Sequence, residues 1–271
     1  MKNQGSGAIR HIIVKIGVKT NEIMCIIVSN DENFKYENKL VENIKSKFPE
    51  VKTIIKNINN KNTNVILGDK NIILYGDGYI YDKLGEYTFK ISAKSFYQTN
   101  PIQTEVLYSK AIEFAKLSKE DILCDLYCGI GTIGIFASRK VKKVYGIEIV
   151  EEAVEDAKEN AKINNVDNIE FIAGDVEKVF RELVEVQNIK PTVIIVDPPR
   201  RGLDETTINK ILELEVDRLV YISCNPSTMV RDLKMLEGKY NIKEIQPVDM
   251  FPYTTHVEVC ALLELKNCQP S

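Results

Sequence analysis

One cysteine of this chain lies where a parallel β-sheet would present reactive side chains. Cys224 follows an apolar run at residues 219–222, which is typical of a buried strand. In an open α/β sheet, the turns after the strands form the functional edge. Pro226 suits an early position of the next helix, and we expect the start of that helix, with help from Arg231, to lower the pKa of the thiol. Such a thiol could act as a nucleophile, whereas an isolated cysteine is more often a small buried hydrophobe.

Two carboxylates could take part in the same chemistry. Asp197 opens the sequence Asp197-Pro198-Pro199-Arg200 at the end of another apolar run. Glu258 lies near the C-terminus, between two valines of a predicted strand. A carboxylate beside a nucleophile could serve as a general base. The simpler alternative for Glu258 is a solvent-facing strand residue.

A glycine-rich turn adds a candidate cofactor site. Residues 125–134 place three glycines, in the order Gly-x-Gly-x-x-Gly, after a strand-like run. Glycine permits a tight turn and the close approach of a dinucleotide or of S-adenosylmethionine. Glu148, at the end of the next predicted strand, could accept from ribose hydroxyls in either. Asp125 and Asp175 favour S-adenosylmethionine, because they could order its methionine end and accept from its adenine amino group. Glycines that serve only the turn are the remaining alternative.

The composition is that of a globular chain of 271 residues with a net charge of −3. Residues 1–100 contain 15 basic and 10 acidic residues, a net +5, and the remainder contains 21 and 29, a net −8. RNA would favour the front part, although a solvated lysine-rich surface explains the charge equally well. No apolar run approaches the roughly 20 residues of a membrane span. With no signal peptide and six widely spaced cysteines, we expect a cytoplasmic protein with no membrane partner.

Residues 1–92 are predicted to form a small α+β domain. Alternating apolar residues indicate a hairpin of strands at 10–18 and 23–29, and helical spacing indicates a helix at 36–48. Further strands are expected at residues 51–58, 72–75, 79–81 and 87–91.

Residues 93–271 are predicted to form an α/β domain. Asn100 and Pro101 suit the N-cap and first position of a helix that continues to residue 117. A helix is expected at 151–163, and strands at 122–126, 144–149, 169–173, 193–196 and 219–222. This alternation is typical of a mostly parallel, doubly wound sheet with helices on both faces. Two last strands, at 242–247 and 257–265, indicate an antiparallel hairpin, as in class I methyltransferases.

Together these segments resemble the RNA uracil-5-methyltransferase family over residues 90–266. The resemblance is carried by residues 96–101, 125–134, 197–200, 223–228 and 250–258. It implies a class I, Rossmann-like methyltransferase fold after a central RNA-binding domain at 1–92. It also implies C5 methylation of a uridine in structured RNA, with 23S rRNA favoured over tRNA. By similarity, the residues that would bind S-adenosylmethionine are Gln98, Tyr127, Thr132, Glu148, Asp175 and Asp197.

The resemblance assigns Cys224 as the nucleophile and Glu258 as the base. Uracil C5 is a poor nucleophile, but a thiolate that adds at C6 turns the ring into an enolate whose C5 can accept a methyl group. A base must then remove the C5 proton so that the thiolate can leave. Asp197 or Arg200 could stabilise the charge that develops on O4.

Two other functions stay open. The first is a class I amino-methyltransferase, in which Cys224 would be incidental. Acid-Pro-Pro sequences occur in such enzymes, but an aromatic residue follows where this chain has Arg200. The second is an RNA-binding fragment with impaired catalysis, because the family usually begins with a β-barrel (TRAM) domain for which we find no counterpart.

The remaining cysteines and one histidine are expected to play structural parts. Cys124 and Cys128 suit a strand and a turn better than a metal site, and Cys260 suits the core. Because Cys25 is the only cysteine before residue 124, we expect no iron–sulfur cluster. His256 could be a turn residue or an RNA contact. A monomer is favoured.

Overall fold

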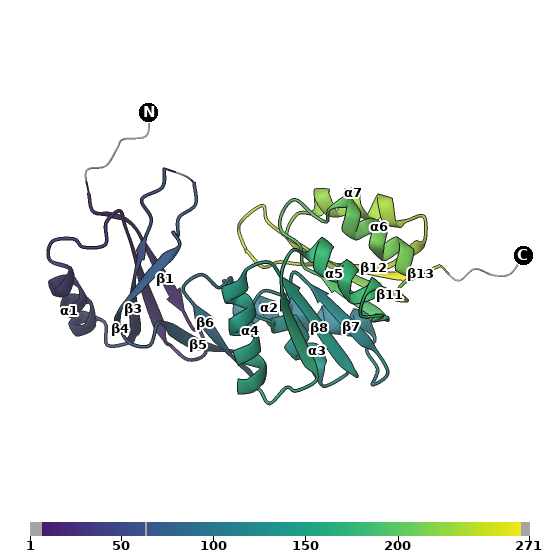
Figure 1. Cartoon of the computed structure of the whole chain (residues 1–271), viewed down its shortest axis with the longest axis horizontal. Coiled ribbons are helices and arrows are strands. Elements are labelled where there is room, and N and C mark those ends of the chain that lie inside the picture. Colours follow the sequence, from purple (N-terminus) through teal and green to yellow (C-terminus); the bar gives the residue numbers. More distant parts are fainter. Residues whose placement is uncertain (1–6, 63, 267–271) are drawn as a thin grey trace, which may run out of the picture. The chain divides into compact units, whose positions relative to one another are not determined.

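The computed structural model describes residues 7–62 and 64–266. The chain divides into two compact units, Met1–Ser95 and Phe96–Ser271, so the division falls shortly after the expected boundary at residue 92 (Figure 1). Each unit has its own sheet and its own buried residues.

The first unit contains a mixed sheet with the strand order β1-β2-β3-β4 and a separate β5-β6 hairpin. The strands are β1 (Ile9–Ile16), β2 (Ile23–Ser29), β3 (Val51–Ile58), β4 (Lys70–Tyr75), β5 (Tyr79–Leu84) and β6 (Tyr87–Ser92). The predicted hairpin is confirmed, because β1 and β2 pair antiparallel. Helix α1 (Glu37–Lys47) links β2 to β3, which run parallel. The helix packs Val41 against Ile27 and Ile54 of the sheet.

The second unit is built on a seven-stranded sheet with the order β12-β13-β11-β10-β7-β8-β9. The strands are β7 (Ile122–Leu126), β8 (Lys143–Glu148), β9 (Ile169–Ala173), β10 (Val193–Val196), β11 (Arg218–Ser223), β12 (Tyr240–Val248) and β13 (Glu258–Leu265). Strands β7 to β11 pair parallel, and β13 runs antiparallel to both of its neighbours. The prediction of a doubly wound sheet with a C-terminal antiparallel hairpin is therefore confirmed.

Six helices of the described chain cover the two faces of this sheet (Figure 1). They are α2 (Pro101–Ala115), α3 (Thr132–Ser138), α4 (Glu151–Ile163), α5 (Val176–Glu185), α6 (Glu205–Leu214) and α7 (Pro226–Leu236). Helix α2 begins as predicted, because the Asn100 side chain accepts a hydrogen bond from the backbone N–H of Gln103. Its proline at the first position has no N–H to leave unpaired.

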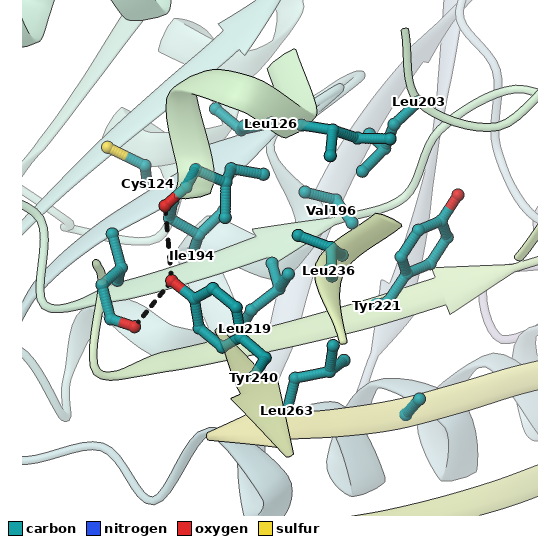
Figure 2. Close-up of a cluster of buried hydrophobic side chains, with 14 of the residues drawn as sticks. Cys124, Leu126, Ile194, Val196, Leu203, Leu219, Tyr221, Leu236, Tyr240 and Leu263 are labelled. Atoms are coloured by element: carbon teal, nitrogen blue, oxygen red, sulfur yellow. Dashed lines mark hydrogen bonds between the residues drawn. The ribbon is translucent and has the colours of Figure 1, made fainter. Parts of the chain in front are cut away.

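The buried strands contribute alternate residues to two separate hydrophobic cores, one on each face of the sheet. Val196 and Tyr221 pack with residues of α5, α6 and α7 on one face, whereas Ile195 and Val220 pack with residues of α2 and α3 on the other. Successive side chains of a strand point to opposite faces of the sheet, and both faces are covered here, so all of these side chains are buried. Figure 2 shows the first core, in which the Tyr240 hydroxyl donates to backbone carbonyls at 3.0 Å and 3.4 Å. The buried tyrosine thus keeps its polar atom satisfied.

The topology determines where the functional turns meet. The strand order reverses between β7 and β10, and in open α/β sheets ligands bind at the carboxyl edge beside this reversal. The turns after β7, β8, β9, β10 and β11 all lie at that edge because the strands are parallel. The predicted site residues of the second unit lie on or near these turns, apart from Gln98 before α2 and Glu258 at the start of β13.

Candidate active site

A cavity of about 600 Å³ lies within the second unit and is lined by residues from these turns. Seven of the eight predicted site residues line it: Gln98, Tyr127, Glu148, Asp175, Asp197, Cys224 and Glu258. They come from segments spread over 160 positions of the sequence, from residue 98 to residue 258. The eighth, Thr132, is buried, and its hydroxyl lies 3.5 Å from that of Tyr108. Thr132 therefore lies behind the glycine turn rather than on the cavity wall.

The glycine turn after β7 needs glycine for two different reasons. Gly131 has a φ of 82°, and a Cβ there would come within 2.4 Å of the Phe171 ring. Gly129 also has a positive φ, 54°, but a Cβ there would meet nothing within 4 Å. Gly129 lines the cavity, so its bare backbone leaves room for a ligand. The turn therefore packs tightly against Phe171 at Gly131 and leaves open space at Gly129.

Glu148 ties this turn to the end of β8. Its carboxylate accepts from the backbone N–H groups of Gly129, at 3.1 Å, and Val150, at 2.9 Å. Asp175 is similarly anchored, because it caps α5 by accepting from the N–H of Lys178 at 3.3 Å. Both residues line the cavity, and each carboxylate can accept more hydrogen bonds than these.

Asp125 supports the turn from beneath. One carboxylate oxygen accepts from the N–H of Gly134 at 2.8 Å, and the other is buried with no partner among the described residues. Burial raises the pKa of Asp125 to about 7, and the charge of Glu148 adds to the rise. Asp125 is not on the cavity wall, so its expected contact with the methionine end of a cofactor stays a prediction.

At the other end of the cavity, Asp197 and Glu258 lie close together. Glu258 is 5% exposed, so the alternative of a solvent-facing strand residue is wrong. Burial raises the pKa of Glu258, and Arg200 opposes the rise. Asp197 is half-buried at the end of β10; burial, followed by the charges of Glu258 and Asp125, raises its pKa to about 8. Two neighbouring carboxyls that are both hard to ionise are typical of sites that transfer protons.

Cys224 is half-buried beside these acids, and its environment differs from the expected one. Burial raises the pKa of the thiol, Glu258 and Asp197 raise it further, and Arg200 opposes them. The expectation of a lowered pKa at a helix start is wrong. Helix α7 begins at Pro226, and the Asn225 side chain already accepts from the N–H of Ser227, so the thiol lies before the helix.

Arg231 does not assist the thiol as expected. Its guanidinium donates to the Asp232 carboxylate at 2.8 Å and to the carbonyl of Arg201, also at 2.8 Å. Asp232 is fully buried and also accepts from the Tyr221 hydroxyl at 2.7 Å and the Leu203 N–H at 2.8 Å. This network fastens α7 to the loop after β10. The cation that acts on the thiol is therefore Arg200.

The loop that carries Arg200 is also held from the turn after β11. The Asn225 side-chain amide and the Thr228 hydroxyl donate to the carbonyl of Arg200 at 3.1 Å and 3.2 Å. Gly202 has a φ of 79°, and a Cβ there would lie 2.5 Å from the Asp232 carboxylate. The two loops therefore pack against each other as one unit.

Sequence reasoning missed one buried residue behind the site. Tyr108 of α2 is buried, and side-chain hydrogen bonds connect it to Thr132 and to Gln98. Burial, together with the charge of Asp197, raises its pKa. Tyr108 thus joins the cavity-lining Gln98 to the helix after the glycine turn. The helical spacing of apolar residues in α2 does not distinguish Tyr108 from an ordinary core residue.

Cys124, Cys260 and His256 do not line the cavity. Cys260 is fully buried with Leu262 in the core below α2, as predicted, and burial raises its pKa to about 12. Cys124 belongs to the opposite core. The His256 ring is exposed and makes an edge-to-face contact with Phe251, which lines the cavity.

This fold and site define a class of protein. The strand order, the antiparallel β13 and the glycine turn followed by acids at the ends of β8 and β9 are those of S-adenosylmethionine-dependent methyltransferases. A M. jannaschii tRNA m1G37 methyltransferase structure shares the fold, with a TM-score of 0.60 and 19% identity over 97% of this chain and 77% of that chain.

The family model described as tRNA (Uracil-5-)-methyltransferase matches residues 31–266, and the chain belongs to this family. A protein of Staphylococcus aureus and one of Oceanobacillus iheyensis, each described as an uncharacterized RNA methyltransferase, are 51% and 50% identical over 96% of this chain and 57% of their own length. The Pyrococcus abyssi tRNA (uracil-54, C5)-methyltransferase, solved with S-adenosyl-L-homocysteine, is 33% identical with a TM-score of 0.78, over 95% of this chain and 60% of that one.

The chain thus spans a little over half the length of the curated relatives it matches. Among the helices that the structure describes, none is both long and apolar enough to span a membrane.

Proposed function

We propose that this chain methylates C5 of a uridine in structured RNA, with S-adenosylmethionine as the methyl donor and Cys224 as the nucleophile. The observation that carries the proposal is that Cys224, Glu258 and Asp197 share one cavity with the glycine turn, in a chain of the uracil-5-methyltransferase family. An amine substrate would give the thiol and the buried Glu258 nothing to do.

The glycine-turn end of the cavity fits S-adenosylmethionine. Gly129 leaves open space, and Glu148 and Asp175 offer acceptors suited to ribose hydroxyls and an adenine amino group. The unpartnered oxygen of Asp125 is buried beneath the glycine turn and off the cavity wall, so the fit to S-adenosylmethionine rests on Gly129, Glu148 and Asp175. Gln98, Tyr127 and Asp197 line the same cavity, and Thr132 acts from behind through Tyr108. When bound, S-adenosylmethionine supplies an electrophilic methyl group.

The reacting end supplies the thiol, a cation and two acids. Cys224 releases its proton to solvent and its sulfur forms a bond to C6, which moves the electrons of the C5–C6 double bond towards O4. Arg200 is the cation that favours the thiolate form, since it opposes the rise in the pKa of Cys224. Asp197, with a pKa of about 8, is protonated at neutral pH and can donate to O4, so it is the better placed of the two candidates for that role.

Glu258 completes the reaction after C5 has gained its methyl group. It removes the C5 proton, the C5–C6 double bond forms again, and the bond from C6 to sulfur breaks. Burial raises the pKa of Glu258, and a base is most effective when its pKa approaches the working pH. The negative charge of Glu258 also disfavours the free thiolate of Cys224. This favours the covalent bond between sulfur and C6 until Glu258 removes the C5 proton and the thiolate is released.

For the RNA, we propose 23S rRNA first and tRNA second, bound in part by residues 1–92 acting as a central RNA-binding domain. The net charge of +5 over residues 1–100 supports this role. The tRNA alternative is favoured by the P. abyssi relative, which is described as a tRNA (uracil-54, C5)-methyltransferase. We further propose that the protein works in the cytoplasm as a monomer.

The test is tritium release from RNA that contains uridine labelled with tritium at C5. The chain should release tritium from 23S rRNA in proportion to the methyl groups it transfers, because only C5 chemistry expels that hydrogen. Methyl transfer without tritium release would establish the amino-methyltransferase alternative. RNA binding without either product would establish an impaired RNA-binding fragment. Release from tRNA alone would reverse the choice of RNA.

A further inference from the structure

The loop between β12 and β13 presents one aromatic side chain fully to solvent. Tyr253 has a relative exposure of 107%, the highest of the exposed large hydrophobic residues of the described chain. An exposed tyrosine gains nothing from packing, and single exposed apolar residues are common. Tyr253 combines this exposure with a positive φ, as Tyr36 also does, but Tyr253 lies on a loop whose Phe251 lines the cavity.

Tyr253 occupies a turn position where glycine would be less strained. The N–H of Thr254 donates to the carbonyl of Phe251 at 3.1 Å, so residues 251–254 form a β-turn with Pro252 at its second position. Tyr253, at the third position, has a φ of 67°. Proline followed by a positive φ is the pattern of a type II turn, which favours glycine or asparagine there. A bulky residue in this region is a genuine outlier that costs free energy.

The turn is firmly built. The Thr254 hydroxyl donates to the Phe251 carbonyl at 2.7 Å and accepts from the His256 N–H at 3.2 Å. The carbonyl of Met250 accepts from the Asn100 side-chain amide at 3.0 Å, which fastens the loop to the start of α2. These bonds fix the backbone of the turn, from which the Tyr253 side chain extends into solvent.

The turn also borders the candidate active site. Phe251, two residues before Tyr253, lines the cavity, and Glu258, five residues after it, is the proposed base. The carbonyl of Phe251 that closes the turn belongs to this same lining residue. An RNA strand that places a uracil beside Cys224 and Glu258 must therefore pass near this turn.

We propose that Tyr253 is a stacking site for the nucleobase that adjoins the uridine entering the cavity. This inference rests on the proposed function. A uridine can reach a thiol inside the cavity only if it leaves its stack, and its neighbour then loses a stacking partner. An exposed aromatic ring on a fixed turn that borders the cavity can replace that partner, and base–aromatic stacking tolerates any base. The unfavourable backbone of Tyr253 is explained because glycine or asparagine could not stack.

The first experiment separates stacking from a structural role. Tyr253→Asn keeps the turn, because asparagine tolerates a positive φ, but removes the ring; Tyr253→Phe keeps the ring. We expect Tyr253→Asn to raise the KM for RNA about 10-fold, with the dissociation constant of S-adenosylmethionine unchanged and the Tm equal or higher. Tyr253→Phe should retain the wild-type KM. A structural role predicts the opposite, a lower Tm with an unchanged KM, and would overturn the proposal.

The matched control is Val186. It is 71% exposed and caps the C-terminal end of α5, whose first turn borders the cavity. The helix has 10 residues, so about 15 Å separates Val186 from that edge. Val186→Ala should leave the KM for RNA and the Tm unchanged.

The second experiment uses the fact that the chain contains no tryptophan. Tyr253→Trp and Val186→Trp each create a single fluorescent reporter. RNA transcribed with 5-fluorouridine should form a covalent complex with Cys224, which holds the RNA in place however weakly it binds. In this complex the emission of Tyr253→Trp should be strongly quenched by the stacked base, whereas that of Val186→Trp should not change.

The outcomes distinguish this inference from the proposed function. If the wild type forms no adduct with 5-fluorouridine RNA and releases no tritium, the proposed function fails, and the stacking site fails with it. If the adduct forms but Tyr253→Trp is not quenched and Tyr253→Asn has the wild-type KM, only the stacking site fails. That second result would leave a protein partner as the reason for the exposed ring.

Discussion

At the glycine-turn end of the cavity the acids are held by the backbone, whereas at the reacting end they are controlled by burial and by one another. Glu148 accepts from two backbone N–H groups and Asp175 from one. Asp197 and Glu258 instead have raised pKa values, with burial as the largest cause in each. A fixed ligand is bound best by fixed acceptors, but proton transfer needs groups whose charge can change. The two ends are built for these different tasks.

The largest expected effect separates the acid Glu258 from the nucleophile Cys224. Cys224→Ala should abolish both turnover and any covalent RNA complex. Glu258→Gln should abolish turnover but still allow attack and methyl transfer, because neither step needs that carboxylate as a base. A protein–RNA band should then survive denaturing electrophoresis when S-adenosylmethionine is present.

Cys260→Ala is the control for the same gel, because this thiol is fully buried two residues beyond Glu258. It should form the 5-fluorouridine adduct as the wild type does. An adduct with Cys224→Ala, or normal turnover by Glu258→Gln, would refute the assigned roles and support the amino-methyltransferase alternative.

The next effect concerns the glycine-turn end alone. Glu148→Ala and Asp175→Ala should each weaken binding of S-adenosylmethionine by about 1–3 kcal/mol, or roughly 5- to 150-fold, without RNA. Because Asp175 also caps α5, Asp175→Ser should restore helix stability but not affinity. Calorimetry provides the measurement, with Glu155→Ala on the exposed face of α4 as the control. Binding of NADH instead would mean that the cofactor was wrongly assigned.

Several regular elements of the second unit were predictable from the sequence. Strands β7, β9 and β10 and helix α4 have the bounds that their apolar patterns indicated. Short buried runs that end in glycine, proline or an acid leave little choice of boundary. The location of the site was also predictable, because parallel strands bring their carboxyl ends to one edge of the sheet.

The environment of the thiol was not predictable in the same way. Arg231 lies near Cys224 in the sequence, but Asp232 and the loop after β10 take its guanidinium. Arg200 lies 24 positions before the thiol and is brought near by that loop. Whether Glu258 is buried depends on its pairing in β13 and on the β10 and β11 turns. These are tertiary contacts between segments with no local pattern in common.

A smaller effect tests how Arg200 and Asp197 act on the thiol. Asp197→Asn removes a negative neighbour and should lower the pKa of Cys224, whereas Arg200→Gln removes a positive one and should raise it. Alkylation by iodoacetamide at pH 8 should become about threefold faster in the first variant and about threefold slower in the second, which corresponds to roughly half a pKa unit. Mass spectrometry of the Cys224 peptide gives the rate. Arg231→Gln should not change it, and a shift there would restore the role first expected for Arg231.

The smallest effect is on stability, and it follows from the raised pKa of Asp197. An unfolded aspartate ionises near pH 4, whereas Asp197 ionises at about 8, so the folded chain binds the extra proton between these values. Its contribution to stability is therefore greatest below pH 4, falls as the pH rises towards 8, and stays low above it. Asp197→Asn should raise the Tm of the second unit by a few degrees at pH 8.5 and by less at pH 5. Asp167→Asn, at an exposed turn, should show no such difference between the two pH values. A Tm lowered equally at both would mean that Asp197 is held as a stabilising charged partner, and the contrast between the two ends of the cavity would not hold.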